Sequence, residues 1–314
     1  MEDMEWIFID GRSKDRTVEI IREYAEKYPD LIRIYDNPDK IVPFAMNIGI
    51  SNSKGKYIVR LDAHADYATD YISKCVHYLD TTDADNVGGV AETKSHGFVG
   101  NAIAKMLSSK FGVGNSQFRT NGESGYVDTV PFGAFRREVF SKYGGYDERL
   151  VRNQDNEMNY RIRKNGGKIY LANDIKLSYY CRDTIKGIAS MANKNGMWNI
   201  ITMNLCPGSM GIRHFIPLAF VMSIIGMTVL SVCGFFILPL VGWILSALFG
   251  LELLLYLGMD ALFSAKLCGS FKEFLLLLVL FPIFHVAYGF GSIKGIFKLL
   301  NKKYRKSGYT PKKI

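Results

Sequence analysis

The chain has 314 residues and a formal net charge of +9, and its charged residues are unevenly spread. No Lys, Arg, Asp or Glu occurs from residue 214 to 251 or from residue 274 to 293, and about 20 apolar residues suffice for a helix to cross a bilayer. Length and composition therefore exclude a single small soluble domain. They predict a soluble part followed by membrane helices.

The first 90 residues alternate strand and helix patterns. Short apolar runs predict strands at residues 5–9, 31–35, 57–61 and 86–90. Apolar residues at helical spacing predict helices at residues 18–25, 43–55 and 71–79. This alternation favours an α/β fold with a mostly parallel, doubly wound sheet, in which the strand ends near Asp10 and Asp62 share one edge.

The order changes after residue 90. We predict helices at 100–111, 137–142 and 154–164, an extended segment at 126–132, and late strands at 168–171 and 175–180. Residues 184–205 form an amphipathic pattern suited to the bilayer surface, although an ordinary surface helix gives the same pattern. Apolar segments follow at 215–238, 241–258 and 274–293, the last containing Pro282, so two or three spans are possible.

The basic excess lies after residue 293, where eight Lys and Arg residues occur without an acid. Such a tail beside apolar spans is typical of a cytoplasmic, lipid-facing segment. Nucleic-acid binding is the weaker interpretation, because the soluble part has no basic, aromatic-rich patch, and we expect no nucleic-acid partner. The five cysteines lack C-x-x-C spacing and are interpreted as reduced and structural. The acidic N-terminal residues are not a signal peptide, so we expect a multi-pass cell-membrane protein with its soluble part in the cytoplasm.

Three acidic positions carry the candidate chemistry. Asp10 ends the first strand, where a carboxylate can bind a base or ribose. Asp62 and His64 follow the third strand, and together they can hold Mg²⁺ or Mn²⁺ on a diphosphate. Asp155 lies at a helix start, where the dipole stabilises an anion. Each position also has a plain structural interpretation as a turn, a strand end or a cap.

Together these motifs resemble family-2 glycosyltransferases, which have the nucleotide-sugar-binding GT-A fold. The resemblance covers I-D-G-x-S-x-D-x-T from Ile9, N-x-G from Asn47, Leu61-Asp-Ala-His and Gln154-Asp155. More narrowly, residues 62–65, 127–135 and 152–157 resemble the succinoglycan-biosynthesis type of membrane glycosyltransferase. The resemblance implies nucleotide binding by Asp10, Asn47 and Asp62, a divalent cation (Mn or Mg) at Asp62 and His64, and Asp155 as general base.

The implied reaction is inverting transfer of a sugar from a nucleotide-diphospho-sugar to a saccharide hydroxyl, with one carboxylate accepting the proton. The expected acceptor is a lipid-linked exopolysaccharide intermediate at the membrane, with other polysaccharide-assembly proteins as possible partners. Glu157 is the alternative base. The alternative functions are transfer to a polyprenyl phosphate, which needs no base, and a catalytically inactive membrane scaffold.

Four departures from the family pattern affect these expectations. His64 replaces a second metal-binding Asp, and Gln154 replaces the acid before the base. Lys194-Asn-Gly-Met-Trp198 keeps only the Trp of the processive Q-x-x-R-W motif, which favours single-sugar transfer. The family also has a strand and helix before residue 5, with the strand inside the sheet beside the nucleotide pocket. Either Met1 is an internal or misassigned start, or the domain is N-terminally truncated, and we expect the chain from Met1 to be poorly folded or weakly active. The predicted divisions are a catalytic domain (1–183), an interfacial helix (184–206), a transmembrane region (207–293) and a basic cytoplasmic tail (294–314).

Overall fold

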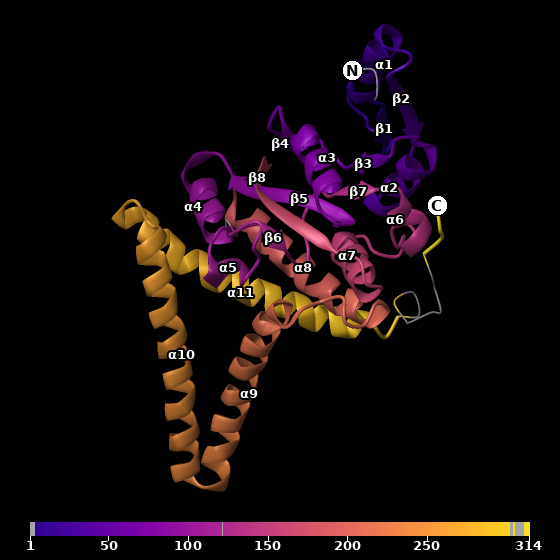
Figure 1. Ribbon diagram of the computed structural model, residues 1–314. Helices are drawn as coiled ribbons and strands as arrows, with labels where there is room; N and C mark the ends of the chain where they lie inside the picture. The colour runs from indigo at the N-terminus through magenta and orange to yellow at the C-terminus, as the bar shows by residue number, and fades with distance from the viewer. Residues whose placement is uncertain (1–3, 121, 302–303, 305–310) are drawn as a thin grey trace. The chain divides into compact units, whose positions relative to one another are not determined.

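A computed structural model describes residues 4–120, 122–301, 304 and 311–314 (Figure 1). The chain forms two compact units, and each is described by itself. The first consists of Met1–Val90, Gly122–Leu177 and Ser307–Ile314, and the second of Ala91–Asn121 and Ser178–Lys306. The functional divisions predicted from the sequence remain predictions, and several tail lysines and the first three residues lie outside the described residues.

The first unit has the predicted alternation of strands and helices. Its N-terminal elements are β1 (Trp6–Asp10), α1 (Thr17–Lys27), β2 (Ile32–Asp36), α2 (Val42–Asn52), β3 (Tyr57–Val59), β4 (Ala65–Tyr67), α3 (Tyr71–Thr81) and β5 (Asn86–Lys94). Its later elements are β6 (Gly125–Tyr126), β7 (Ala134–Arg136), α6 (Glu138–Tyr143), α7 (Gln154–Lys164) and β8 (Ile169–Tyr180). The last residues of β5 and β8 belong to the second unit.

The strands form a mixed sheet, whereas a mostly parallel one was expected. β1 and β2 pair in parallel as a separate two-stranded sheet. The larger sheet has the order β3-β7-β5-β8-β4, with β6 beside β8. β7 follows the loop at 127–133, lies between β3 and β5, and is antiparallel to both. The predicted late strands are one continuous strand, β8, which includes the exposed Asn173 and the partly exposed Asp174.

The sheet is interrupted between β1 and β3, which lie in separate sheets. A cavity of about 910 Å³ is lined by these two strands and by α2 and α3. Every residue of β1 and β3 is only partly buried, although parallel strands in α/β folds are normally covered on both faces. Arg60 and Asp62 are among the residues that line this cavity, so the cavity borders the candidate site.

The second unit is built around long helices. Its elements are α4 (Gly97–Leu107), α5 (Lys110–Val113), α8 (Ile185–Leu205), η1 (Ile212–His214), α9 (Ile216–Ile237), α10 (Pro239–Leu267) and α11 (Phe271–Lys298). α11 runs beside α8 (Figure 1) at very short range. A Cβ added at Gly291 would lie 2.0 Å from the Asn193 carbonyl oxygen, so only glycine allows this approach.

Three helices are long and apolar enough to span a membrane, which confirms the three predicted apolar segments. α9 and α10 form a hairpin whose helices meet at Gly234 and Gly242. The Ser223 hydroxyl donates a hydrogen bond to Glu252, so this carboxylate within an apolar helix has a polar partner in the protein. In α11, 39% of the apolar window is buried, against 17% in α9 and 6% in α10. Protein therefore encloses α11 far more than the hairpin.

Candidate active site

Arg60 lies at the centre of the candidate site, immediately after β3. Its guanidinium binds Asp62 through two hydrogen bonds, Nε–Oδ1 at 2.7 Å and Nη2–Oδ2 at 2.8 Å. Its Nη1 donates to Asp155 Oδ1 at 2.6 Å. The side chain is only 6% exposed. Burial disfavours its charge, but the two carboxylates outweigh burial and raise the pKa of Arg60. One buried cation thus joins two predicted site residues from distant parts of the chain.

Asp155 is the second residue of α7, where the helix dipole favours a carboxylate. Its side chain is 33% exposed. Only its Oδ1 accepts a hydrogen bond from the residues that the structure describes. Desolvation raises the pKa of the Asp155 carboxyl, Arg60 acts in the opposite direction, and Asp62 adds to the rise. The second oxygen, Oδ2, is therefore a reachable and comparatively basic proton acceptor.

Two non-glycine residues at the site have left-handed backbone angles. Asn153, just before α7, has a φ of 64°, and Phe132 has a φ of 48°. The Phe132 ring centroid lies 5.7 Å from the Arg60 guanidinium carbon. Its carbonyl accepts a hydrogen bond from the Tyr71 hydroxyl at 2.8 Å. The hydrogen bond from Tyr71 helps to hold Phe132 in this unfavourable conformation, and such backbone angles are common at functional sites.

Asp62 and His64 lie in the turn between β3 and β4. The Asp62 backbone N–H donates to the Tyr67 hydroxyl oxygen at 2.7 Å. Burial raises the pKa of Tyr67 to about 12, so the phenol stays protonated at neutral pH. The His64 ring packs edge-on against Phe132, with centroids 6.4 Å apart. Both predicted metal ligands are thus on one short turn beside Arg60.

The donor atoms of this turn suit an ion that arrives with a ligand. Within the described ranges, no three His, Cys, Asp or Glu residues form a cluster able to hold a metal. Mg²⁺ is commonly bound through one or two carboxylates together with substrate phosphates and water. Each oxygen of Asp62 keeps a lone pair beyond its bond to Arg60, and His64 adds an imidazole. The two residues therefore fit a phosphate-bound cation better than a permanently bound one.

Asp10 and Asn47 are partly engaged in holding the fold. Both Asp10 oxygens accept hydrogen bonds from Ser13, as in a turn after a strand. Asn47 donates to the Tyr146 carbonyl at 3.0 Å and accepts from the Tyr146 N–H at 2.7 Å. Tyr146 is buried, and its hydroxyl interacts with Arg60. Asn47 therefore acts on the site by fixing Tyr146, and its role in nucleotide binding remains a prediction.

Glu157, the alternative base, is bound by a different cation. Both of its oxygens accept hydrogen bonds from Arg161, each at 2.8 Å. The Glu157 side chain is 5% exposed and that of Arg161 is 14% exposed. Arg161 also donates to the carbonyls of Gly144 and Gly145. This pair anchors α7 to the loop after α6, and it leaves Asp155 as the more accessible carboxylate.

Sequence reasoning missed Arg60, Tyr67 and Phe132 as members of the site. A usable signal for Arg60 was present, since it is a charged residue inside the apolar run Tyr57-Ile-Val-Arg-Leu. A charge there requires a buried partner. No local pattern indicated that this partner would include Asp155.

Residues 1–144 match the family model described as Glycosyl transferase family 2. "Succinoglycan biosynthesis protein ExoA" of Rhizobium meliloti (strain 1021) is 33% identical over 178 residues, which are 56% of this chain and 54% of that protein. "Dolichyl N-acetyl-alpha-D-glucosaminyl phosphate 3-beta-D-2,3-diacetamido-2,3-dideoxy-beta-D-glucuronosyltransferase" of Methanococcus voltae is 28% identical over 192 residues, 59% of this chain and 60% of that protein.

A crystal structure of GalNAc-T7 with UDP, GalNAc and Mn²⁺ aligns with a TM-score of 0.45 and 17% identity, covering 66% of this chain and 45% of that one. This chain spans little more than half the length of the two curated relatives. The family match covers the N-terminal α/β part of the chain, and the relative from Rhizobium meliloti matches 56% of the chain. Three apolar helices follow the α/β part. Residues 1–144 are therefore similar to glycosyltransferase family 2, and the α/β sheet that the structure describes agrees with this similarity.

Proposed function

We propose that this protein transfers a sugar, with inversion, from a nucleotide-diphospho-sugar to a hydroxyl of a lipid-linked saccharide. The observation that carries the proposal is the bridge from Arg60 to Asp62 and Asp155. It links a carboxylate suited to the diphosphate side with a carboxylate suited to the acceptor side. The names of the relatives from Rhizobium meliloti and Methanococcus voltae support a polysaccharide product and a lipid-linked acceptor.

In this reaction the acceptor hydroxyl attacks the anomeric carbon of the donor sugar. A new carbon–oxygen bond forms as the bond to the diphosphate breaks, and the nucleoside diphosphate leaves with the electron pair. Asp155 takes the hydroxyl proton on Oδ2, while Oδ1 stays bound to Arg60. Arg60 is the positioning residue, because it fixes both carboxylates and is itself almost fully buried. One base without a carboxylate nucleophile suits inversion.

A divalent cation, Mn or Mg, is proposed at Asp62 and His64, where it supplies positive charge to the leaving diphosphate. Asp10 is proposed on the base or ribose side of the nucleotide. It follows Ile9, which lines the same cavity as Asp62. Its partly exposed position at the end of β1 supports this role.

Matched substitutions on α7 test the assignment of the base. Asp155→Asn is expected to lower sugar transfer by at least about 100-fold, because general-base catalysis contributes roughly that much or more. Glu157→Gln keeps hydrogen-bonding capacity toward Arg161 and should reduce transfer far less. Transfer to the saccharide acceptor and release of nucleoside diphosphate are measured together. If Asp155→Asn retains full transfer, the base assignment fails, and transfer to a lipid phosphate, which needs no base, becomes the better description.

We also infer that α9 and α10 cross the membrane whereas α11 lies at its surface along α8. The high burial of α11 supports this arrangement. The C-terminal residues give independent support, because they belong to the same unit as α6. The Gly145 N–H donates to the Lys312 carbonyl at 2.8 Å, and the Ile314 N–H to the Phe140 carbonyl at 3.3 Å. A chain that leaves this unit and returns to it must cross an even number of times.

The positive-inside rule then favours a cytoplasmic location for the first unit, which carries the candidate active site, and for the C-terminal end of the chain. A reporter enzyme fused after Ile314 tests this topology. Cytoplasmic reporter activity is expected, and activity on the external face would contradict the two-span arrangement.

A further inference from the structure

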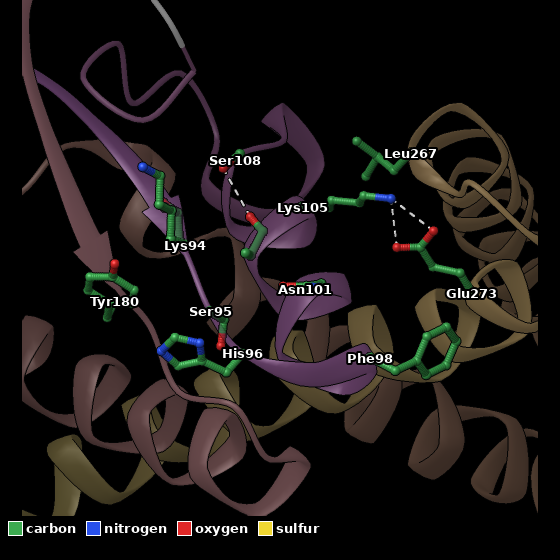
Figure 2. A pocket seen from close by; sticks show the side chains of 12 residues that line it. Lys94, Ser95, His96, Phe98, Asn101, Lys105, Ser108, Tyr180, Leu267 and Glu273 are labelled. Carbon is green, nitrogen blue, oxygen red and sulfur yellow. Dashed lines mark hydrogen bonds and ion pairs between the residues drawn. The ribbon is translucent and has the colours of Figure 1, made fainter.

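A second cavity lies in the unit that carries the long helices, and none of its lining residues belongs to the candidate active site. Its volume is about 720 Å³. It runs across the exposed face of α4, from the end of β5 and Tyr180 on one side to the α10–α11 junction on the other (Figure 2). Phe98, Asn101, Lys105 and Ser108 share this face through their three- and four-residue spacing. We call this cavity the α4 groove.

Cationic and hydrogen-bonding side chains line the α4 groove. Lys94 and His96 lie on one side and Lys105 on the other (Figure 2). Lys94 has an ion pair with Glu92 at 3.4 Å, with both side chains about half exposed, and such surface pairs contribute little. The His96 ring stacks on Tyr180, with centroids 5.4 Å apart. This side of the groove thus keeps a cation and a flat aromatic wall accessible to a ligand.

Lys105 is held in place by a carboxylate that is itself fixed. Its Nζ lies 2.7 Å from Glu273 Oε1 and 2.8 Å from Oε2. Glu273 is 9% exposed, against 41% for Lys105, and also accepts a hydrogen bond from the Gly269 N–H at 2.6 Å. An ammonium has three N–H donors, so at least one on Lys105 is left for a ligand in the groove. The lining lysines outnumber the lining carboxylate by two to one.

Apolar side chains border the same groove at the end of a candidate membrane helix. Leu267 ends α10, and Phe98 is 52% exposed. Phe271, which begins α11 just before Glu273, is 73% exposed. With 29 residues, α10 is about 44 Å long, well beyond the roughly 30 Å hydrocarbon core, so its end reaches headgroup level. Lys266 and Lys272 flank this end, as expected beside lipid phosphates.

We propose that the α4 groove binds the phosphate of the lipid-linked acceptor, with Lys94, His96 and Lys105 as ligands and Phe98 and Leu267 against the start of its apolar chain. This inference rests on the proposed function, since it names the site that would hold the lipid end of that acceptor. Lysines bind phosphate as compact point charges, and charge-assisted hydrogen bonds are the strong ones. Glu273 limits the net charge of the groove and keeps Lys105 extended toward it.

Direct binding to the full-length chain in detergent tests the proposal, with farnesyl diphosphate as an apolar phosphate ester. Inorganic pyrophosphate supplies the phosphate without the chain, and farnesol the chain without phosphate. Lys94→Ala and Lys105→Ala should each weaken farnesyl diphosphate binding about tenfold, the value of one hydrogen bond to a charged group. Glu273→Gln should strengthen it, because a negative charge is removed. Lys298→Ala, about 38 Å along α11 from Glu273, is the control and should change nothing.

Opposite effects at Lys105 and Glu273 distinguish a ligand site from a structural ion pair, since loss of a structural pair would affect both variants alike. Melting temperatures of all variants are measured in parallel, and Lys94→Ala, outside that pair, serves if Lys105→Ala does not fold. Equal binding of farnesol, or unchanged binding in the lysine variants, would overturn the proposal. So would pyrophosphate binding as tight as farnesyl diphosphate, or full displacement by a nucleoside diphosphate with Mg²⁺. Hydrolysis of the nucleotide-sugar donor without acceptor should be the same in the groove variants as in the unmodified chain. If the unmodified chain does not hydrolyse the donor, the proposed function fails, whatever the result for the groove.

Discussion

Replacing Arg60 by methionine tests the central feature of the site, because Arg60 is the cation shared by Asp62 and Asp155. Methionine keeps much of the side-chain length and removes the charge. Two unit charges about 4 Å apart attract by about 4 kcal/mol at an effective dielectric constant of about 20. Asp155 is one-third exposed, which reduces this, and about 2 kcal/mol is a reasonable value for the interaction that fixes the base.

A loss of about 2 kcal/mol in positioning corresponds to a roughly 30-fold slower transfer. The pH dependence gives a more specific signature. Arg60 lowers the pKa of Asp155, whereas burial and Asp62 raise it. Removing Arg60 therefore raises the pKa of Asp155 further, so the acid limb of the kcat/KM profile should move to higher pH. Arg60→Lys should rescue little, because a single ammonium cannot reproduce the two-sided guanidinium contacts.

The assay is sugar transfer by the full chain in detergent or nanodiscs from pH 5 to 9, with binding of nucleoside diphosphate measured on the same samples. Arg12→Met is a suitable control, because Arg12 forms an exposed ion pair with Asp36. An Arg60→Met variant with a normal rate and an unmoved acid limb would refute the role assigned to Arg60. An equal loss in Arg12→Met would show that the effect is not specific to the site.

Three further predictions concern backbone and packing. Asn153→Ala should be less stable than Asn153→Gly by about 1 kcal/mol, because both remove the side chain but only glycine adopts a φ of 64° freely; equal melting temperatures would contradict this. Gly291→Val should lower the melting temperature by several degrees, since a Cβ there meets the Asn193 carbonyl, whereas Gly258→Val, with open space around it, should not; similar effects would count against the close α8–α11 packing. Gly49→Leu should lower binding of an apolar fluorescent dye to the cavity between β1 and β3 and raise the melting temperature, because a Cβ there has room beside Ile9; unchanged dye binding would mean that the dye binds elsewhere.

The sequence predicted the elements whose pattern repeats over many residues. The apolar runs of β1 and β2 and the spacing of α1, α3 and α7 were sufficient because each repeats over one or more turns or pleats. β4 and β7 were missed, since three residues are too few to show a period of two. β7 enters the sheet because of its partners β3 and β5, which no local signal reveals.

The same limit applies to the site. Asp62 and Asp155 were found as polar residues at a strand end and a helix start, which are local features. The pairing of both with Arg60 is a tertiary contact. Glu157, the alternative base, and Arg161 lie four residues apart, a spacing at which oppositely charged side chains on one helix can pair. They are buried, because Arg161 also binds carbonyls of the loop after α6. The four-residue spacing correctly predicts that Glu157 and Arg161 are neighbours. Their burial, which the sequence does not show, makes them a structural pair.

The charges at the site support this division of roles. Asp62 and Asp155 together carry two negative charges, and Arg60 offsets one of them. A divalent cation and the two phosphates of a nucleotide-sugar cancel one another to a first approximation. One carboxylate charge then remains at the site. In the proposed reaction this charge is on Asp155, and the proton from the acceptor hydroxyl neutralises it during transfer. A second Asp at position 64 would add a negative charge beside the leaving diphosphate, whereas the imidazole of His64 can bind a cation without adding one. In the proposed reaction, a histidine at position 64 would therefore lower the negative charge on the diphosphate side, while Arg60 offsets one of the two carboxylate charges that it joins.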